Sequence, residues 1–146
     1  LDIAINTRQL LPDVVLSVTV PHTLPLDEQE QLALELVSAG ADLIQTEGGT
    51  SARPLSSGSL GLIEKAAPTL AAVHSISKAF DAVGCNIPLI GASGLSAVTL
   101  PMAIAAGASG VGIGSAINRL HDELEMIACV RRLKSAFPSS KSLIFG

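Results

Sequence analysis

Two short glycine turns hold the residues of this chain that are best suited to chemistry. The first contains Gly91, Ser93 and Gly94, and the second contains Gly112, Gly114 and Ser115. A backbone without side chains lets a phosphate group come close, and the N–H groups at a helix start donate hydrogen bonds to it. A helix dipole adds roughly 0.3–1 kcal/mol to such binding. These turns predict a site for a phosphate-bearing small molecule, although such glycines can also serve only to make tight turns.

Glu47 and His22 are the candidates for catalysis. Glu47 stands at the expected end of a strand, ahead of Gly48 and Gly49, where a carboxylate can act as a general base, bind ligand hydroxyls or orient a neighbour. His22 follows the expected end of another strand and is either a site residue or an ordinary loop histidine. Gln45 is suited to hydrogen-bond a ligand or to satisfy polar groups inside the fold. We expect Gln45, Gly48 and Gly49 to contact the ligand.

The composition argues against several other classes of function. The formal net charge of −4 and the lack of a basic run exclude an electrostatic nucleic-acid site, which needs clustered Lys and Arg. Cys85 and Cys129 show no metal or redox spacing, and no metal-ligand motif occurs, so we expect no metal site. Residues 83–118 carry no charged side chain, but glycines and prolines divide them into pieces too short to span a bilayer. We therefore expect no membrane segment.

Strand and helix signals alternate along the chain and must position these residues. Apolar runs predict strands over residues 14–20, 42–46, 87–90 and 110–113. Helical spacing predicts a helix from Asp27 with Glu30 completing a capping box, one with Pro68 in its first turn, one capped by Ser96 or Thr99, and one over residues 122–137. Such alternation requires a parallel sheet with right-handed crossovers, either an open doubly wound sheet or a closed barrel.

The strand interiors favour the barrel. Ser17 and Thr19 share one face of the first strand, Gln45 and Glu47 share one face of the second, and glycines occupy one face of the fourth. A small, polar face suits the lumen of a barrel, whereas an open sheet covered on both sides would be apolar on both. We predict an α/β fold, the C-terminal half of a TIM-type parallel β/α barrel with about four βα units. Residues 1–146 would then form a single barrel domain whose N-terminal half is absent.

The balance of apolar and charged residues indicates that other protein covers this chain. Hydrophobic residues make up 48% and charged residues only 15%, whereas an average globular domain has roughly 25% charged residues. A chain of this size needs a polar exterior if it folds alone. We expect the cover to come from the missing barrel half or from a homo-oligomer.

Four long segments resemble one known family closely. They are LSVTVPHTLPLDEQ (residues 16–29), ADLIQTEGGTS (41–51), LGLIEKAAPTLAAV (60–73) and IAAGASGVGIGSAINRL (104–120). The family is the uncharacterised hypothetical chloroplast reading frame called ycf twenty-three, found in cyanobacteria and algal plastids. The resemblance implies an aldolase-type TIM barrel with an upstream half, the end of a preceding helix in residues 2–11, and a location in the plastid stroma or the cyanobacterial cytoplasm. It carries no established activity to transfer.

At superfamily level, the order of residues 45–51, 91–94 and 112–115 is similar to that of flavin-dependent nitronate monooxygenases. The last two strand ends of those enzymes hold the phosphate of FMN. The chain departs from them at Thr50 and Ser51, which stand where a catalytic histidine would be expected. Thiazole synthases and ribulose-phosphate-binding barrels share the glycine turns as well, so FMN is one candidate cofactor among several phosphorylated ligands.

These expectations leave three functions open. The first is an enzyme that binds a phosphorylated substrate or FMN, either an FMN-dependent oxidoreductase or a lyase or synthase of phosphorylated metabolites. The second is a non-catalytic barrel that senses a metabolite and regulates a process through a protein partner. The third is a structural half-barrel subunit.

Overall fold

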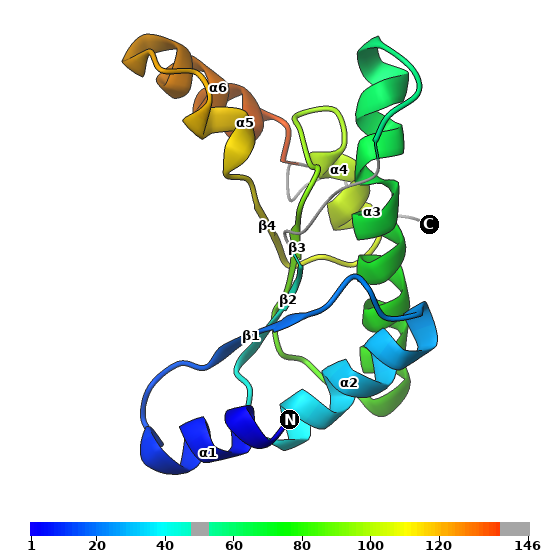
Figure 1. The fold of residues 1–146 in the computed structure, drawn as a ribbon, viewed down its shortest axis with the longest axis vertical. Coiled ribbons are helices and arrows are strands. Elements are labelled where there is room, and N and C mark those ends of the chain that lie inside the picture. The colour runs from blue at the N-terminus through cyan, green and yellow to red at the C-terminus, as the bar shows by residue number, and fades with distance from the viewer. Residues whose placement is uncertain (48–52, 138–146) are drawn as a thin grey trace, which may run out of the picture.

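The computed structural model describes residues 1–47 and 53–137 as four strands that alternate with helices (Figure 1). In chain order the elements are α1 (Asp2–Leu10), β1 (Ser17–Val20), α2 (Leu26–Ser38), β2 (Leu43–Thr46), α3 (Gly58–Val83), β3 (Leu89–Ala92), α4 (Leu100–Ala105), β4 (Gly110–Gly112), α5 (Ser115–Asn118) and α6 (Glu123–Ser135). Every predicted strand and helix is present. The sequence patterns did not indicate α5, which is a single helical turn.

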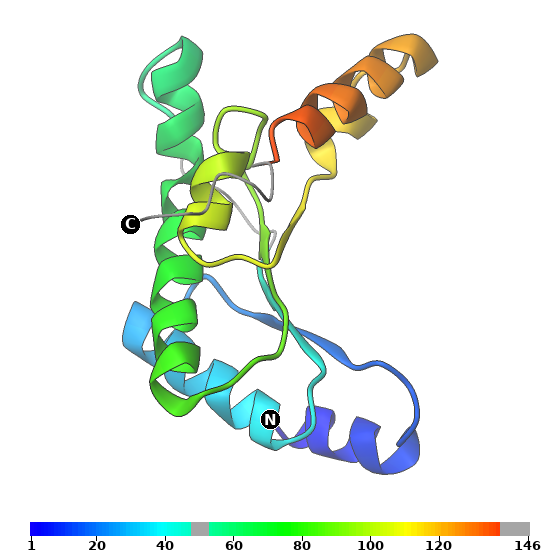
Figure 2. The same cartoon turned by 180° about the vertical axis from the view of Figure 1, so that it is seen from behind.

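The four strands form one parallel sheet in the order β1-β2-β3-β4. Thr19 pairs with Gln45, Gln45 with Ile90, and Ile90 with Gly110 across the sheet. Because the order never reverses, right-handed crossovers place all the connecting helices on one face. Figures 1 and 2 show α2, α3 and α4 on that same side of the sheet. The α/β prediction is confirmed, and the arrangement is compatible with half of a β/α barrel.

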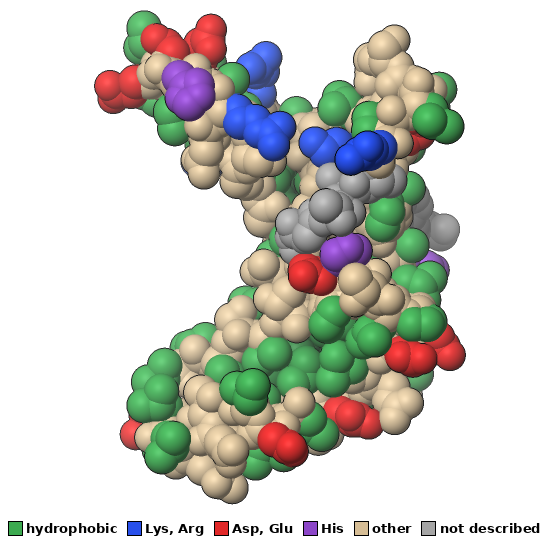
Figure 3. Space-filling view, in the orientation of Figure 1, with side chains coloured by type: hydrophobic (Ala, Val, Ile, Leu, Met, Phe, Trp, Pro, Cys, Tyr) green, Lys and Arg blue, Asp and Glu red, His purple; other side chains and the backbone are tan. Residues whose placement is uncertain are grey.

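The two faces of the sheet differ as the alternation predicted. On the helix side, Val20 and Ile44 are fully buried and Leu89 is nearly so. On the opposite face, Ser17 and Thr19 are exposed. Figure 3 shows the molecule hollowed on the side away from α3, between α1 and the α5–α6 pair. Among the described residues, the sheet therefore has one face packed by helices and one face without them.

The first strand is shorter than predicted. Residues 14–16 lie outside β1, and the side chains of Val14 and Val15 are 55% and 74% exposed. Within the described residues, β1 pairs with β2 on one side only, and its pairing begins where Ser17 meets Leu43. Apolar character alone does not continue a strand that has no neighbour to pair with.

The start of α2 differs from the predicted capping box. The helix begins at Leu26 with Pro25 at the N-cap position, and no side chain caps it. The carboxylate of Glu30 instead accepts a hydrogen bond from the hydroxyl of Ser75 on α3. The acid therefore joins two neighbouring helices and does not close its own helix end.

The start of α3 was also predicted wrongly, because Pro68 lies inside the helix and the helix begins at Gly58. A carboxylate stabilises the additional turns: Glu64 accepts hydrogen bonds from the amides of Leu55 (2.7 Å) and Ser56 (3.0 Å) and from the Ser56 hydroxyl (2.7 Å). The preceding loop is thereby folded onto the helix. Gly61 permits this approach, because a Cβ there would lie 2.1 Å from the carbonyl oxygen of Ser56.

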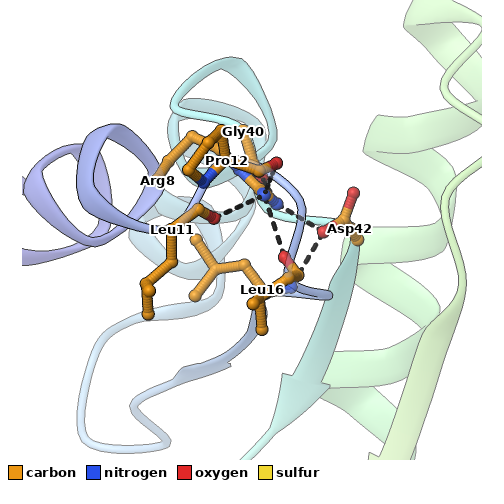
Figure 4. A network of polar contacts seen from close by, with 7 residues as sticks. Arg8, Leu11, Pro12, Leu16, Gly40 and Asp42 are labelled. Atoms are coloured by element: carbon orange, nitrogen blue, oxygen red, sulfur yellow. Dashed lines mark hydrogen bonds and ion pairs between the residues drawn. The ribbon is translucent and has the colours of Figure 1, made fainter.

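One arginine ties α1 to the edge of the sheet where the strands begin (Figure 4). The guanidinium of Arg8 donates to the carbonyl oxygens of Gly40, Pro12 and Val14 at 2.7–2.9 Å, and to that of Leu11 at 3.3 Å. Arg8 also pairs with Asp42. The amide of Leu16 donates to the same carboxylate at 2.8 Å, and these two contacts, Leu16 first, lower the pKa of Asp42.

We predict that Arg8→Ala lowers the free energy of unfolding by about 2 kcal/mol, because several carbonyl groups lose a charged donor at once. Arg8→Lys should recover little of this loss, since an ammonium group cannot reproduce the planar fork of a guanidinium. Urea unfolding of the complete protein measures both. The matched control is Lys78→Ala, which removes an exposed pair with Asp81 and should cost about 0.5 kcal/mol or less. Equal losses for Arg8→Ala and Lys78→Ala would contradict this role for Arg8.

Candidate functional site

The predicted site residues gather at one edge of the sheet. His22 follows β1, Glu47 follows β2 directly, and Ser93 and Gly94 follow β3 directly. Gly114 comes two residues after β4 and is the N-cap of α5. Because the strands are parallel, all of these positions lie at the carboxyl ends, where β/α folds place their ligand sites.

The structure brings Glu47 and His22 into direct contact. Oε2 of Glu47 accepts a hydrogen bond from the backbone amide of His22 at 2.9 Å and lies 2.7 Å from Nδ1 of its ring. The two side chains are 37% and 33% exposed, so the pair is reachable from solvent. An ionised carboxylate can only accept hydrogen bonds, so Nδ1 carries a proton in this contact; in the neutral ring, Nε2 then keeps its lone pair.

The pKa of Glu47 bears on which of the roles left open by the sequence this carboxyl is suited to. The hydrogen bond from the His22 side chain, and after it that from the His22 amide, lower the pKa of the Glu47 carboxyl. A carboxylate with a lowered pKa is a weaker general base at neutral pH. The geometry therefore favours an orienting role for Glu47, with Nε2 of His22 as the group that is available to move a proton.

The turn after β3 holds an unusual backbone conformation. Ser93 has φ 92° and Gly94 has φ 67°, so both lie in the left-handed region. This region is uncommon for a residue that carries a side chain, and such outliers cluster at functional sites. The hydroxyl of Thr69, on α3, lies 2.8 Å from the Ser93 carbonyl oxygen. Sequence analysis did not single out Thr69, because a threonine in an apolar helix carries no visible functional signal.

The two glycine turns differ in how they lead into a helix. Gly114 is the N-cap of α5, the short helix that the sequence patterns did not indicate. The turn after β3 does not lead directly into a helix, because α4 begins only at Leu100. A tight turn intervenes, in which the amide of Ser96 donates to Oγ1 of Thr99 at 3.0 Å. Because α5 has only four residues, its helix dipole contributes little at the Gly114 turn. Any anion would therefore be bound mainly by hydrogen bonds from backbone N–H groups.

The glycines themselves serve different purposes. A Cβ on Gly91 would lie 3.2 Å from Cγ2 of Val73, so the structure gives Gly91 a role in packing β3 against α3. Gly112 lies beside Ala92 of β3, which keeps the two turns on neighbouring strands. A side chain on Gly114 would meet no atom within 4 Å. The position that a side chain on Gly114 would occupy is therefore open space.

The remaining predicted residues are only partly placed. Gln45 is half-buried and lies in register between Thr19 and Ile90, on the face of the sheet without helices. It therefore points to the same side as the predicted ligand. Gly48 and Gly49 fall outside the described residues.

The charge distribution is compatible with an anionic ligand at this edge. Figure 3 shows the Lys and Arg side chains of this face gathered in its upper part, beside the top of α3 and the α5–α6 pair. β3 and β4 run toward the same end in Figure 1.

Within residues 1–47 and 53–137, no group of three or more His, Cys, Asp and Glu side chains is arranged to hold a metal ion. Among the helices of the same residues, none is long and apolar enough to cross a membrane.

Comparison with known proteins decides the family. A family model described as "Protein of unknown function (DUF561)" matches residues 1–143. The chain belongs to this family. The DUF561 chain is also similar to proteins called "Uncharacterized protein ycf23", with 37% identity over 98% of its length to that of Pyropia yezoensis and 38% over 94% to that of Porphyra purpurea. The corresponding protein of Cyanophora paradoxa is 40% identical over 89% of the chain.

The resemblance to the chloroplast reading frame is thereby confirmed. The match covers 50% of the length of the Pyropia yezoensis and Porphyra purpurea proteins and 51% of that of Cyanophora paradoxa. The DUF561 chain thus spans about half the length of the curated relatives it matches.

The contact between Glu47 and His22 predicts a pH-dependent contribution to stability. The native pKa of Glu47 lies below its ordinary value of 4.5, so between the two values the unfolded chain binds more protons. The contribution is present above pH 4.5 and is lost as the pH falls through the native pKa. We predict that Glu47→Gln destabilises the complete protein at neutral pH and that this difference shrinks in acid. Urea unfolding at neutral pH and in acid measures this difference. The control is Glu28→Gln, at an exposed position of α2. A stability difference between wild type and Glu47→Gln that is the same at both pH values would contradict the prediction.

Proposed function

We propose that this chain is part of a β/α-barrel enzyme that anchors a phosphate-bearing small molecule at the ends of β3 and β4 and moves a proton with His22. The observation that carries the proposal is the contact between Nδ1 of His22 and Oε2 of Glu47 at the carboxyl edge of the sheet. A carboxylate that holds one ring nitrogen and leaves the other free is the arrangement that orients a histidine for general acid–base catalysis.

The barrel itself is supported by the topology. The sequential strand order leaves one face of the sheet without helices, as a barrel lumen requires. In the part of the chain that the structure describes, β1 and β4 are each paired on one side only. The relatives are about twice as long as the matched region, which is enough for an upstream half with the remaining strands. We propose that such a half, or a second copy of the chain, pairs with both edges.

The position of the groups sets the size of the ligand. Neighbouring strands lie about 4.8 Å apart, so a point above β1 and β2 is up to about 10 Å from a point above β3 and β4. His22 and Glu47 stand at the first location and the two glycine turns at the second. A ligand that uses both must carry its reactive atoms several bonds from its phosphate, as a sugar phosphate or FMN does.

FMN is the narrower form of this proposal. The open space at Gly114 fits the phosphate end of FMN and that of a sugar phosphate alike, because neither requires a side chain there. Ser93, Gly94, Gly112 and Ser115 would surround that phosphate, and Gln45 would face the rest of the ligand. FMN supplies two-electron redox chemistry when it is bound. With a sugar phosphate, the same residues suit a lyase or synthase that begins by removing a proton.

A regulatory barrel remains the competing proposal, because large apolar side chains are available to a partner. Ile3, Leu55 and Leu124 are 82%, 98% and 77% exposed. Such a protein would sense the phosphorylated ligand without converting it, in the plastid or the cyanobacterial cytoplasm. It would need the ligand site but not the acid–base group.

Substitution of His22 separates the two functions. We predict that His22→Gln in the complete protein lowers turnover of a phosphorylated substrate, identified by native mass spectrometry of the wild type, by about 10²–10⁴-fold, because the proton-transfer group is lost. Affinity for that ligand, measured by titration calorimetry, should change little. The control is His74→Gln, which alters an exposed histidine of α3. A protein that binds the ligand equally well and shows no turnover in wild type or variant would favour the regulatory barrel.

Gly114 offers a test of the phosphate anchor. Its φ is −110° and it faces open space, so Gly114→Val should leave thermal stability nearly unchanged. The new side chain would occupy the space proposed for the phosphate, and we predict at least a tenfold loss of affinity, about 1.4 kcal/mol. Gly114→Ala should lose less. Thermal shift with FMN and with inorganic phosphate measures both ligands, and unchanged binding in Gly114→Val would argue against an anchor at this turn.

A further inference from the structure

Two buried hydroxyl groups meet at the peptide that ends β3. Thr46 is 3% exposed and Thr69 is 6% exposed. Oγ1 of Thr46 accepts a hydrogen bond from the amide of Ala92 at 2.8 Å and donates to the Ala92 carbonyl oxygen, 3.0 Å away. The side chain of Thr46 thus makes hydrogen bonds with both the backbone N–H and the backbone C=O of Ala92 in the neighbouring strand.

The place of this contact in the sheet explains why a side chain is needed. The register of β2 and β3 pairs Ile44 with Leu89 and Gln45 with Ile90. One residue further on, Thr46 is not paired through its backbone in that register, and its hydroxyl serves the Ala92 amide and carbonyl instead. The hydroxyl therefore holds together the carboxyl ends of two strands at the level of the site.

Thr69 approaches the same peptide from the helix layer. Its Oγ1 lies 3.2 Å from the carbonyl oxygen of Ala92 and 2.8 Å from that of Ser93. Ser93 is the residue with φ 92°, so the hydroxyl of Thr69 holds the residue whose backbone is in the left-handed region. A hydroxyl has one proton to donate, and the shorter distance indicates that Thr69 donates it mainly to the Ser93 carbonyl oxygen.

These contacts form a continuous path to the imidazole. Thr69 on α3 holds Ser93, Thr46 on β2 holds Ala92, and the residue after Thr46 is Glu47, whose carboxylate binds the amide and ring of His22. Among the described residues, no buried side-chain nitrogen or oxygen lacks a hydrogen-bond partner. The path therefore links the β3 turn with the loop after β1 through hydrogen bonds joined by two steps along the backbone, from Ser93 to Ala92 and from Thr46 to Glu47.

We propose that Thr46 and Thr69 are positioning residues that hold the end of β2 against the β3 turn and thereby set the orientation of the His22 ring through Glu47. This inference rests on the proposed function only in taking His22 as the reactive group. Valine has nearly the same shape as threonine, so packing alone would be satisfied by either. Only the threonine hydroxyl can accept the hydrogen bond from the Ala92 amide, and its removal would leave a buried donor without an acceptor.

The test measures which ring nitrogen of His22 carries the proton, and it needs no substrate. ¹⁵N NMR of the ring nitrogens in the complete protein, in mildly alkaline solution where imidazoles are neutral, distinguishes Nδ1–H from Nε2–H. His22→Gln identifies the resonances of His22 among the three histidines. We expect a single Nδ1–H form in wild type and a mixture of both forms in Thr46→Val. Thr46→Ser, which keeps the hydroxyl, should restore the wild-type spectrum.

The matched control is Thr19→Val, the same substitution at an exposed position of β1 that also belongs to the site edge; it should leave the spectrum unchanged. Thr69→Val should shift the His22 resonances in the same direction as Thr46→Val, though less. If Thr46→Val does not fold, Thr69→Val compared with Thr69→Ser decides the question.

The outcomes separate the inference from the proposed function. A folded Thr46→Val or Thr69→Val protein with the wild-type His22 spectrum would overturn the positioning role and leave the His22–Glu47 pair standing. A wild-type protein in which His22 lacks the Nδ1–H form would overturn the pair itself and, with it, both the inference and the proposed acid–base function.

Discussion

The structure depends on the parallel pairing of four strands that follow one another in sequence. This order forces each connection to cross over the sheet, and crossovers of one hand send every connecting helix to the same side. Three consequences follow among the described residues: one face is packed by α2, α3 and α4, the other face carries no helix, and every strand presents its carboxyl end at a single edge. Residues from distant parts of the chain meet at that edge without any long excursion of the backbone.

The two ends of the strands have different chemistry. At the amino edge, Arg8 and Asp42 join carbonyl and amide groups of the surrounding loops, which is a stabilising arrangement. At the carboxyl edge, Glu47 contacts one ring nitrogen of His22, and a side chain on Gly114 would meet no atom within 4 Å. The division that we propose, between a stabilising amino edge and a reactive carboxyl edge, is the one that β/α barrels show.

Much of the fold could be predicted from local chemistry. Gly84 ends α3 with φ 67°, as the glycine predicted, and the carboxylate of Asp122 caps α6 by accepting from the amide of Glu125 at 2.8 Å. The start of α3 could not be predicted in this way. Glu64, in its first turns, accepts a hydrogen bond from Ser56 in the loop before the helix, and the helix continues through Pro68; neither feature is visible in the local sequence pattern.

The candidate site was predictable in its parts and not in its connections. Strand ends identified Glu47 and His22 separately, but their contact spans 25 positions and depends on the course of the loop after β1. Thr46 and Thr69 gave no signal, because a threonine among β-branched and apolar residues is indistinguishable from core until its hydroxyl is seen to bind a peptide. Gly91 has a second reason to be glycine that the sequence did not indicate, since a Cβ there would lie 3.2 Å from Cγ2 of Val73.

The most direct test of the account is a crystal structure of the complete protein with its phosphate-bearing ligand. The account predicts the phosphate against the backbone of residues 93–94 and 112–115, with the remainder of the ligand extending toward β1 and Nε2 of His22 facing its reactive atoms. A phosphate bound elsewhere in the molecule, or a ligand that leaves Nε2 of His22 turned away from it, would contradict the account.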